Sequence, residues 1–149
     1  MRAAAGRLRR VSAGPDAAYF VVDDLDWAED AATGEIPAAM LEEARRRGGG
    51  GRKILATGEG GFHSTYSEMP PGYTMPPHRH DTDEIVVVLD GSCTFSAGSG
   101  AEGAHDRVLR ARDSVVLPAG RVHGFACGPD GLKLLTIARE PYATELVDD

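Results

Sequence analysis

Short runs of alternating apolar and polar residues dominate the chain from residue 52 onward, and they predict β-strands. The runs are rich in β-branched and aromatic residues, and Gly, Pro and Asp turns separate them. Asp90-Gly91 is typical of a tight hairpin between two of the strands. Many short, evenly spaced strands indicate an all-β sandwich or a barrel closed on itself. The predicted strands are 53–57, 61–68, 84–89, 92–97, 107–109, 114–117, 122–127 and 132–138.

A different pattern occupies the segment from Ile36 to Arg47, where Met40, Leu41 and Ala44 share a helical face. The glycines of residues 48–51 are expected to end this helix. We interpret the short N-terminal helical segment as a cover for an open end of the strand scaffold. A lid over a functional site is the alternative.

The two ends of the chain differ in charge from its middle. Residues 1–18 carry several arginines and a single acid, Asp16, and are interpreted as a flexible tail, with an electrostatic arm as the alternative. Phe20 to Val22 predicts a short strand, and residues 140–149 are expected to form an acidic tail. The remaining residues, 19–139, are expected to form a single domain.

Composition narrows the class of protein. The chain has 149 residues, of which 42% are hydrophobic, and this suffices for one domain with a core. The net charge of -7 argues against a nucleic-acid-binding protein, which needs a basic face. No apolar run is long enough to span a bilayer. Two cysteines, Cys93 and Cys127, make no disulfide framework, so we expect a cytoplasmic protein with buried thiols.

Candidate metal ligands gather in one stretch before the predicted strand 84–89. His78 and His80 are two residues apart, so an extended backbone points both side chains to the same face. Glu84 follows closely and adds a carboxylate. Neutral imidazoles together with a carboxylate suit zinc, iron, copper or nickel. A His-x-His pair alone is equally explained by a surface pair or by a core histidine bonded to backbone.

The spacing around this pair extends to two glycines, and the whole frame resembles the first motif of the cupin superfamily. That motif has a glycine, His-x-His, a glutamate and a second glycine, which correspond here to Gly72, His78, His80, Glu84 and Gly91. The stretch 112–127 resembles the second motif, and it matches at Pro118, Gly120 and His123. It departs from the family pattern at Arg112, where glycine is expected, and at Cys127, where asparagine is expected.

The resemblance implies a small jelly-roll barrel, the double-stranded β-helix of cupins, with a metal inside. It implies four metal ligands: His78, His80, Glu84 and His123. It also implies one divalent transition metal, with Fe(II) favoured and Mn, Ni, Zn or Cu as alternatives. Cupins usually form homodimers, often through N-terminal strands, so Phe20 to Val22 is a candidate pairing strand.

Three functions are consistent with such a site. The first is a dioxygenase, similar to quercetinase-like cupins, that acts on a small enol, carbonyl or aromatic substrate. The second is a redox-neutral lyase, isomerase or decarboxylase that uses the metal as a Lewis acid. The third is a non-catalytic sensor or small-molecule binder. Fold alone does not decide between them.

Candidates for a catalytic acid or base lie on the predicted strand 61–68. Tyr66 and His63 belong to opposite faces of this strand, so only one of them can look into a barrel. Met69, Tyr73 and Met75 follow, and together with Tyr66 they favour an apolar mouth for the site, with a place in the core as the alternative.

Overall fold

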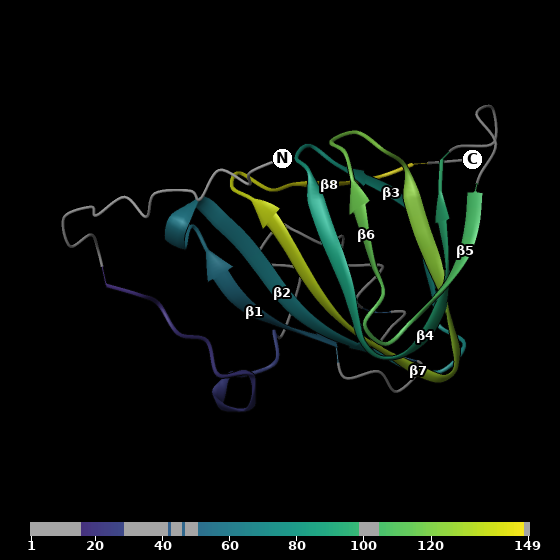
Figure 1. Cartoon of the computed structure of the whole chain (residues 1–149), viewed down its shortest axis with the longest axis horizontal. Helices are drawn as coiled ribbons and strands as arrows, with labels where there is room; N and C mark the ends of the chain where they lie inside the picture. Colours follow the sequence, from purple (N-terminus) through teal and green to yellow (C-terminus); the bar gives the residue numbers. More distant parts are fainter. Residues whose placement is uncertain (1–15, 29–41, 43–45, 47–50, 99–104, 148–149) are drawn as a thin grey trace, which may run out of the picture.

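Strands make up most of the computed structural model, which describes residues 16–28, 42, 46, 51–98 and 105–147 (Figure 1). Two short 3-10 turns, η1 (Val22–Asp24) and η3 (Glu59–Gly61), accompany them. This confirms the all-β class. The strands are β1 (Gly51–Thr57), β2 (Phe62–Met69), β3 (Thr74–His80), β4 (Glu84–Ala97), β5 (His105–Arg110), β6 (Ser114–Leu117), β7 (His123–Arg139) and β8 (Thr144–Leu146).

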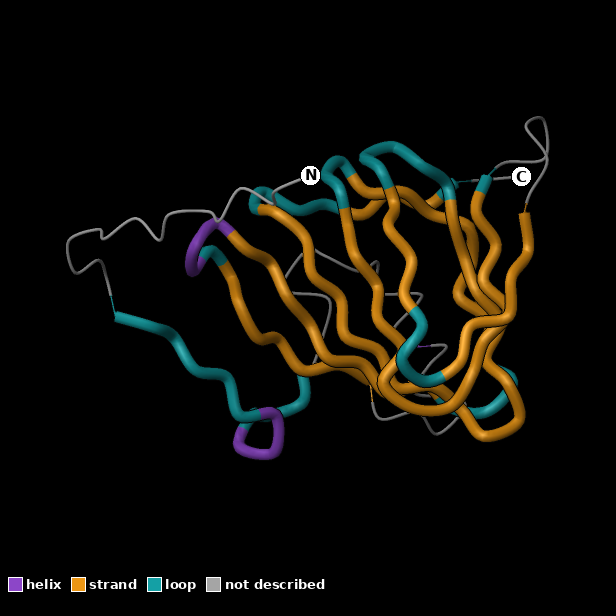
Figure 2. The backbone as a smooth tube through the Cα atoms, in the orientation of Figure 1, coloured by secondary structure: helices purple, strands orange, loops and turns teal. Residues whose placement is uncertain are grey.

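The strands form one antiparallel sheet that curls over on itself, as the tube in Figure 2 shows. We call one side the β2 half: β1, β2 and β6 with residues 84–88 of β4 and 132–139 of β7. The other side is the β3 half: β3, β5 and β8 with residues 92–97 of β4 and 123–127 of β7. Strands β4 and β7 therefore belong to both halves. Their long mutual ladder holds the curled sheet together.

The two long strands, β4 and β7, each bend at a glycine. Gly91 has φ 76° and Gly131 has φ 77°, a conformation that glycine adopts at little cost. A β carbon at Gly91 would collide with the carbonyl oxygen of Gly131, so the bend requires this close approach. The ladder shifts register on both sides of Gly91, which marks bulges. The predicted hairpin at Asp90-Gly91 is therefore wrong, since the strand continues through it.

The turn between β5 and β6 explains one departure from the cupin pattern. Arg112 has φ 80°, and among the described residues it is the single non-glycine with positive φ. Glycine is the residue that adopts this conformation without steric cost. The position where the cupin pattern expects glycine thus has, in this chain, a backbone conformation that suits glycine.

The ends of the chain differ from expectation. Phe20 to Val22 does not form a strand: Val22 is the first residue of η1, and Phe20 and Val21 before it have no regular secondary structure. The expected homodimer therefore has no N-terminal strand to pair at this place and stays a prediction. Most of the expected helix at 36–47 lies outside the described residues, although Glu42 and Arg46 are helical. Within the described part of the chain, no helix is long and apolar enough to cross a bilayer.

The expected acidic tail from Glu140 contributes structure. Its residues Thr144–Leu146 form β8, which pairs with His78 to His80 of β3. The folded part of the chain thus continues past the limit of 139 expected from the sequence. This strand closes the edge of the β3 half.

An apolar core fills the space between the halves, with Tyr73 and Val88 each 1% exposed. Cys93 and Cys127 are register partners on β4 and β7, and both are buried. Burial raises the pKa of the Cys93 thiol to about 11 and that of the Cys127 thiol to about 12. Both side chains are therefore protonated thiols in the apolar interior at neutral pH.

Candidate metal centre

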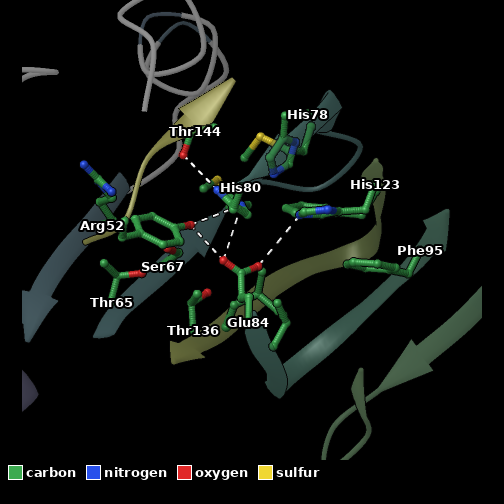
Figure 3. Close-up of a pocket in the computed structure, with 16 residues that line it drawn as sticks. Arg52, Thr65, Ser67, His78, His80, Glu84, Phe95, His123, Thr136 and Thr144 are labelled. Atoms are coloured by element: carbon green, nitrogen blue, oxygen red, sulfur yellow. Dashed lines mark hydrogen bonds and ion pairs between the residues drawn. The ribbon is translucent and has the colours of Figure 1, made fainter. Parts of the chain in front are cut away.

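Three histidines converge at one end of the barrel interior, and all three come from the β3 half (Figure 3). His78 and His80 lie on β3, and His123 begins β7 as the register partner of His78. Each ring offers one nitrogen, and the three nitrogens lie within 4.8 Å of one another. The antiparallel pairing of β3 with β7 thus brings together ligands from the two sequence motifs.

Backbone carbonyls orient two of the rings. His78 Nδ1 lies 2.8 Å from the carbonyl oxygen of Pro76, and His123 Nδ1 lies 2.9 Å from that of Arg121. A carbonyl oxygen can only accept, so each Nδ1 carries the proton and donates it. In a neutral ring the other nitrogen, Nε2, then keeps its lone pair. Such a partner is the usual companion of a metal-ligating histidine.

The third ring, His80, is oriented by the segment that contains β8. Its Nδ1 lies 3.3 Å from the carbonyl oxygen of Ala143 and 3.0 Å from Thr144 Oγ1. This nitrogen is therefore also placed to donate, which leaves Nε2 of His80 with its lone pair. All three rings share one tautomer.

Burial keeps these rings neutral. It lowers the pKa of His80 to about 3, with a further contribution from the two neighbouring imidazoles. It lowers the pKa of His123 to about 4 and that of His78 in the same direction. Desolvation disfavours the charged imidazolium. The three lone pairs are consequently available to a cation over a wide pH range.

Glu84 faces the histidines from the β2 half. Its Oε1 lies 3.8 Å from His123 Nε2, and its Oε2 lies 3.3 Å from His80 Nε2. Burial raises the pKa of this carboxyl to about 7, although a hydrogen bond from Tyr142 acts in the opposite direction. A buried carboxylate beside three imidazole lone pairs is a donor set that suits a divalent transition metal.

Tyr142 belongs to the same centre, although the sequence analysis did not single it out. Its hydroxyl donates to Glu84 Oε2 at 2.8 Å and lies 3.1 Å from His80 Nε2. Its ring stacks between His63 and His80, at centroid distances of 4.3 Å and 4.6 Å. Tyr142 lies in the stretch expected to be a tail, where no alternation of apolar and polar residues marked a strand or a pocket wall.

The two acid–base candidates occupy different sides of β2. His63 is fully buried on the inner face behind Tyr142, and its Nδ1 lies 3.0 Å from Glu140 Oε1. Tyr66 is on the outer face, where its hydroxyl donates to Glu68 Oε1 at 2.5 Å. The ring of Trp27 lies 6.3 Å from that of Tyr66. Tyr66 therefore does not face the histidines.

A cavity of about 60 Å³ adjoins the centre. Its wall includes both polar and apolar side chains, so a bound molecule would meet both kinds of surface. Met69 and Met75 line the cavity as expected and also belong to the apolar core, whereas Tyr73 is a core residue. The polar lining residues include Arg52, Thr65, Ser67, Thr136 and Thr144, and the apolar ones include Met69, Met75, Val86, Phe95, Phe125 and Leu134.

Solved structures with the same fold include an oxalate decarboxylase, an 11S globulin and a vicilin. An oxalate decarboxylase from Bacillus subtilis matches with a TM-score of 0.57 and 16% identity, over 64% of this chain and 27% of that chain. An 11S globulin from Wrightia tinctoria, whose structure reveals an auxin binding site, matches with a TM-score of 0.62 and 19% identity, over 72% of this chain and 30% of that chain. Vicilin from Corylus avellana matches with a TM-score of 0.57 and 15% identity, over 64% of this chain and 31% of that chain. This chain spans less than a third of the length of each.

Another structure of the Bacillus subtilis oxalate decarboxylase, matched with a TM-score of 0.54 and 16% identity over 59% of this chain and 24% of that chain, concerns the Mn(II) centres of that enzyme. No curated protein sequence is significantly similar to this chain. Residues 65–138 match a family model described as a cupin domain. The family model, the curled sheet and the shared fold agree, and this chain belongs to the cupin superfamily.

Proposed function

We propose that this chain is a metal-dependent dioxygenase that acts on a small enol, carbonyl or aromatic substrate. The observation that carries the proposal is the donor set of three neutral imidazoles and one buried carboxylate beside a cavity. His78, His80, His123 and Glu84 would hold the metal, with Fe(II) favoured because imidazole and carboxylate together suit it. When bound, such a metal supplies one-electron redox chemistry.

The surrounding residues would bind and orient the substrate. Hydroxyls of Thr65, Ser67 and Thr136 line the cavity and can hydrogen-bond a substrate oxygen. Phe95 and Phe125 form part of the apolar wall, which excludes water and accommodates a carbon skeleton. The cavity thus favours a small molecule with a polar end and an apolar end.

Oxygen consumption tests this function directly. The metal-free protein is loaded with Fe(II) or with Zn(II), and oxygen uptake is recorded with a panel of small diketones, enols and catechols. Uptake that needs both Fe(II) and a substrate is expected, and the Zn(II) form should be inactive. Turnover by the Zn(II) form without oxygen would contradict the dioxygenase.

A redox-neutral decarboxylase or lyase is the second candidate, and Arg52 favours it. This arginine is 2% exposed and lies on the cavity wall, where its charge would attract a carboxylate. The likeness to oxalate decarboxylase shows a shared fold only, but it suggests small carboxylates as the substrates to test. Carbon dioxide release by the Mn(II) form under anaerobic conditions would support this candidate over the first.

A further inference from the structure

Three consecutive residues of one segment contact the proposed ligands. The Tyr142 hydroxyl reaches Glu84 and His80, while the Ala143 carbonyl and the Thr144 hydroxyl both reach Nδ1 of His80. The segment is anchored at its far end by β8, which pairs with β3. Its residues are therefore held in place by strand pairing next to the site.

The proton of the Tyr142 hydroxyl has two acceptors within reach. One is Glu84 Oε2 at 2.8 Å, and the other is the lone pair on His80 Nε2 at 3.1 Å. A phenol has one proton to donate, so only one of these contacts is a hydrogen bond from Tyr142 at a time. A metal on His80 Nε2 would occupy that lone pair. Glu84 Oε2 would then be the remaining acceptor of the two.

The two oxygens of Glu84 have different surroundings. Oε2 accepts from Tyr142 and lies 3.3 Å from His80 Nε2, whereas Oε1 lies 3.8 Å from His123 Nε2. Both oxygens are therefore near an imidazole nitrogen, but Tyr142 engages only Oε2. A hydrogen bond to one oxygen restrains rotation of the carboxylate and makes that oxygen a poorer donor to a cation. Oε1 is then the better donor of the two to a metal.

We propose that Tyr142 is a positioning residue of the metal centre, whose hydroxyl holds Glu84 Oε2 so that the carboxylate binds metal through Oε1 alone. This restraint keeps a coordination position open for substrate. The inference rests on the proposed metal site and is independent of whether the reaction is oxidative. Stacking of the ring between His63 and His80 places the hydroxyl.

The test compares the wild-type protein with Tyr142→Phe, which removes the hydroxyl and keeps the stacked ring. Tyr19→Phe is the matched control, because Tyr19 is 86% exposed. Affinities for Co(II) and Mn(II) are measured by titration calorimetry, and the ligand-field absorption of the Co(II) forms is recorded. We expect Tyr142→Phe to weaken binding by about 10-fold to 100-fold, the usual effect of removing a partner of a metal ligand. We expect the Co(II) spectrum to change because the carboxylate of Glu84 is no longer held at Oε2, and Tyr19→Phe to change neither quantity.

A double-mutant cycle shows whether the effect runs through the carboxylate. In a Glu84→Gln background, Tyr142→Phe should have little further effect on Co(II) affinity. An undiminished effect there, or an unchanged spectrum in the single variant, would overturn the proposal. A phenolate-to-metal absorption band in the wild-type Fe(III) form that Tyr142→Phe lacks would make Tyr142 a direct ligand and also overturn it. Failure of the wild-type protein to bind any of these metals would overturn the proposed function as well.

Discussion

The two halves of the curled sheet make unequal contributions to the centre. The β3 half supplies three imidazoles whose Nδ1 atoms are held by backbone carbonyls in that half or directly before its strands β7 and β8. The β2 half supplies one carboxylate, Glu84. Burial acts on both, but in opposite directions on the pKa, because it favours the neutral form of each group. The pKa of His80 falls to about 3, whereas that of Glu84 rises to about 7.

This difference separates two tasks. At neutral pH the β3 half is already in the protonation state that binds a cation. The β2 half decides the charge of the centre, since Glu84 gains or loses its proton near neutrality. Substitutions in the two halves should therefore have different consequences.

The largest loss of stability is expected from a substitution at the bend between the two halves. We expect Gly91→Ala to lower the free energy of unfolding by about 3–5 kcal/mol, because it combines backbone strain with a collision against Gly131. Urea denaturation measures the loss. Gly72→Ala is the control: Gly72 has φ 71° but open space around it, so strain alone should cost about 1–2 kcal/mol. Equal losses would mean that the bend relaxes around an added methyl group.

The β3 half should lose much of its affinity for metal when one imidazole is removed. We expect His123→Ala to weaken metal binding by more than the roughly 100-fold that loss of a ligand's partner costs, since it removes a donor atom itself. Elemental analysis and metal titration measure the change. His105→Ala, an exposed histidine on β5, should behave as the wild type. Unchanged metal content in His123→Ala would refute the four-ligand site.

The β2 half should make metal binding depend on pH. Below a pH of about 7 the Glu84 carboxyl is protonated in the metal-free protein, and a metal must displace that proton. Affinity should therefore fall about tenfold per pH unit as the pH drops below 7, and it should be level above that. The histidines add no slope near neutrality because their pKa values are lower. Titrations of Glu84→Gln should lose this slope, and a slope that persists would assign the proton to another group.

The smallest expected effect concerns Arg112, on the turn before β6. Its φ of 80° costs about 1–2 kcal/mol for a residue with a side chain. Arg112→Gly would remove this strain. The greater conformational freedom of glycine in the unfolded chain would offset about 0.5–1 kcal/mol of that gain in stability. We expect a net stabilisation of about 0.5 kcal/mol, seen as a higher urea midpoint. Arg110→Gly, which lies within β5, should instead destabilise the protein, and a loss in Arg112→Gly would show that the arginine side chain supports the turn.

The sequence predicted most of the strands and the convergence of the histidines because both have a local signal, although β3 and β8 were not among the predicted strands. Alternation marks β2 and β4, and fixed spacing marks His78 and His80. Glycine at residue 91 was ambiguous, because a tight turn and a bulge both require its positive φ. The close approach of the Gly131 backbone to Gly91 distinguishes the bulge from the turn, and the sequence does not show this approach because the two residues are far apart along the chain.

Tyr142 had no local signal at all. Strand β8 is three residues long and polar in part, so its pairing with β3 depends on exposed backbone groups of β3 rather than on its own pattern. The contact from Tyr142 to Glu84 follows from that pairing. A sequence pattern points to the candidate metal ligands, whereas the residues that orient them depend on the tertiary fold.

The ladder between β4 and β7 also bears on how quickly the protein folds. It pairs Glu84 with Ala138 and Ala97 with His123, residues that are far apart along the chain. Contacts of this kind form slowly, because a long loop must close before they give any stability. His78 and His80 are neighbours early in folding, but His123 meets them only when β7 pairs with β3, and Glu84 faces them only when the sheet has curled. Metal uptake should therefore follow folding and then slow the reverse step, since a ligand that binds only the native state stabilises it.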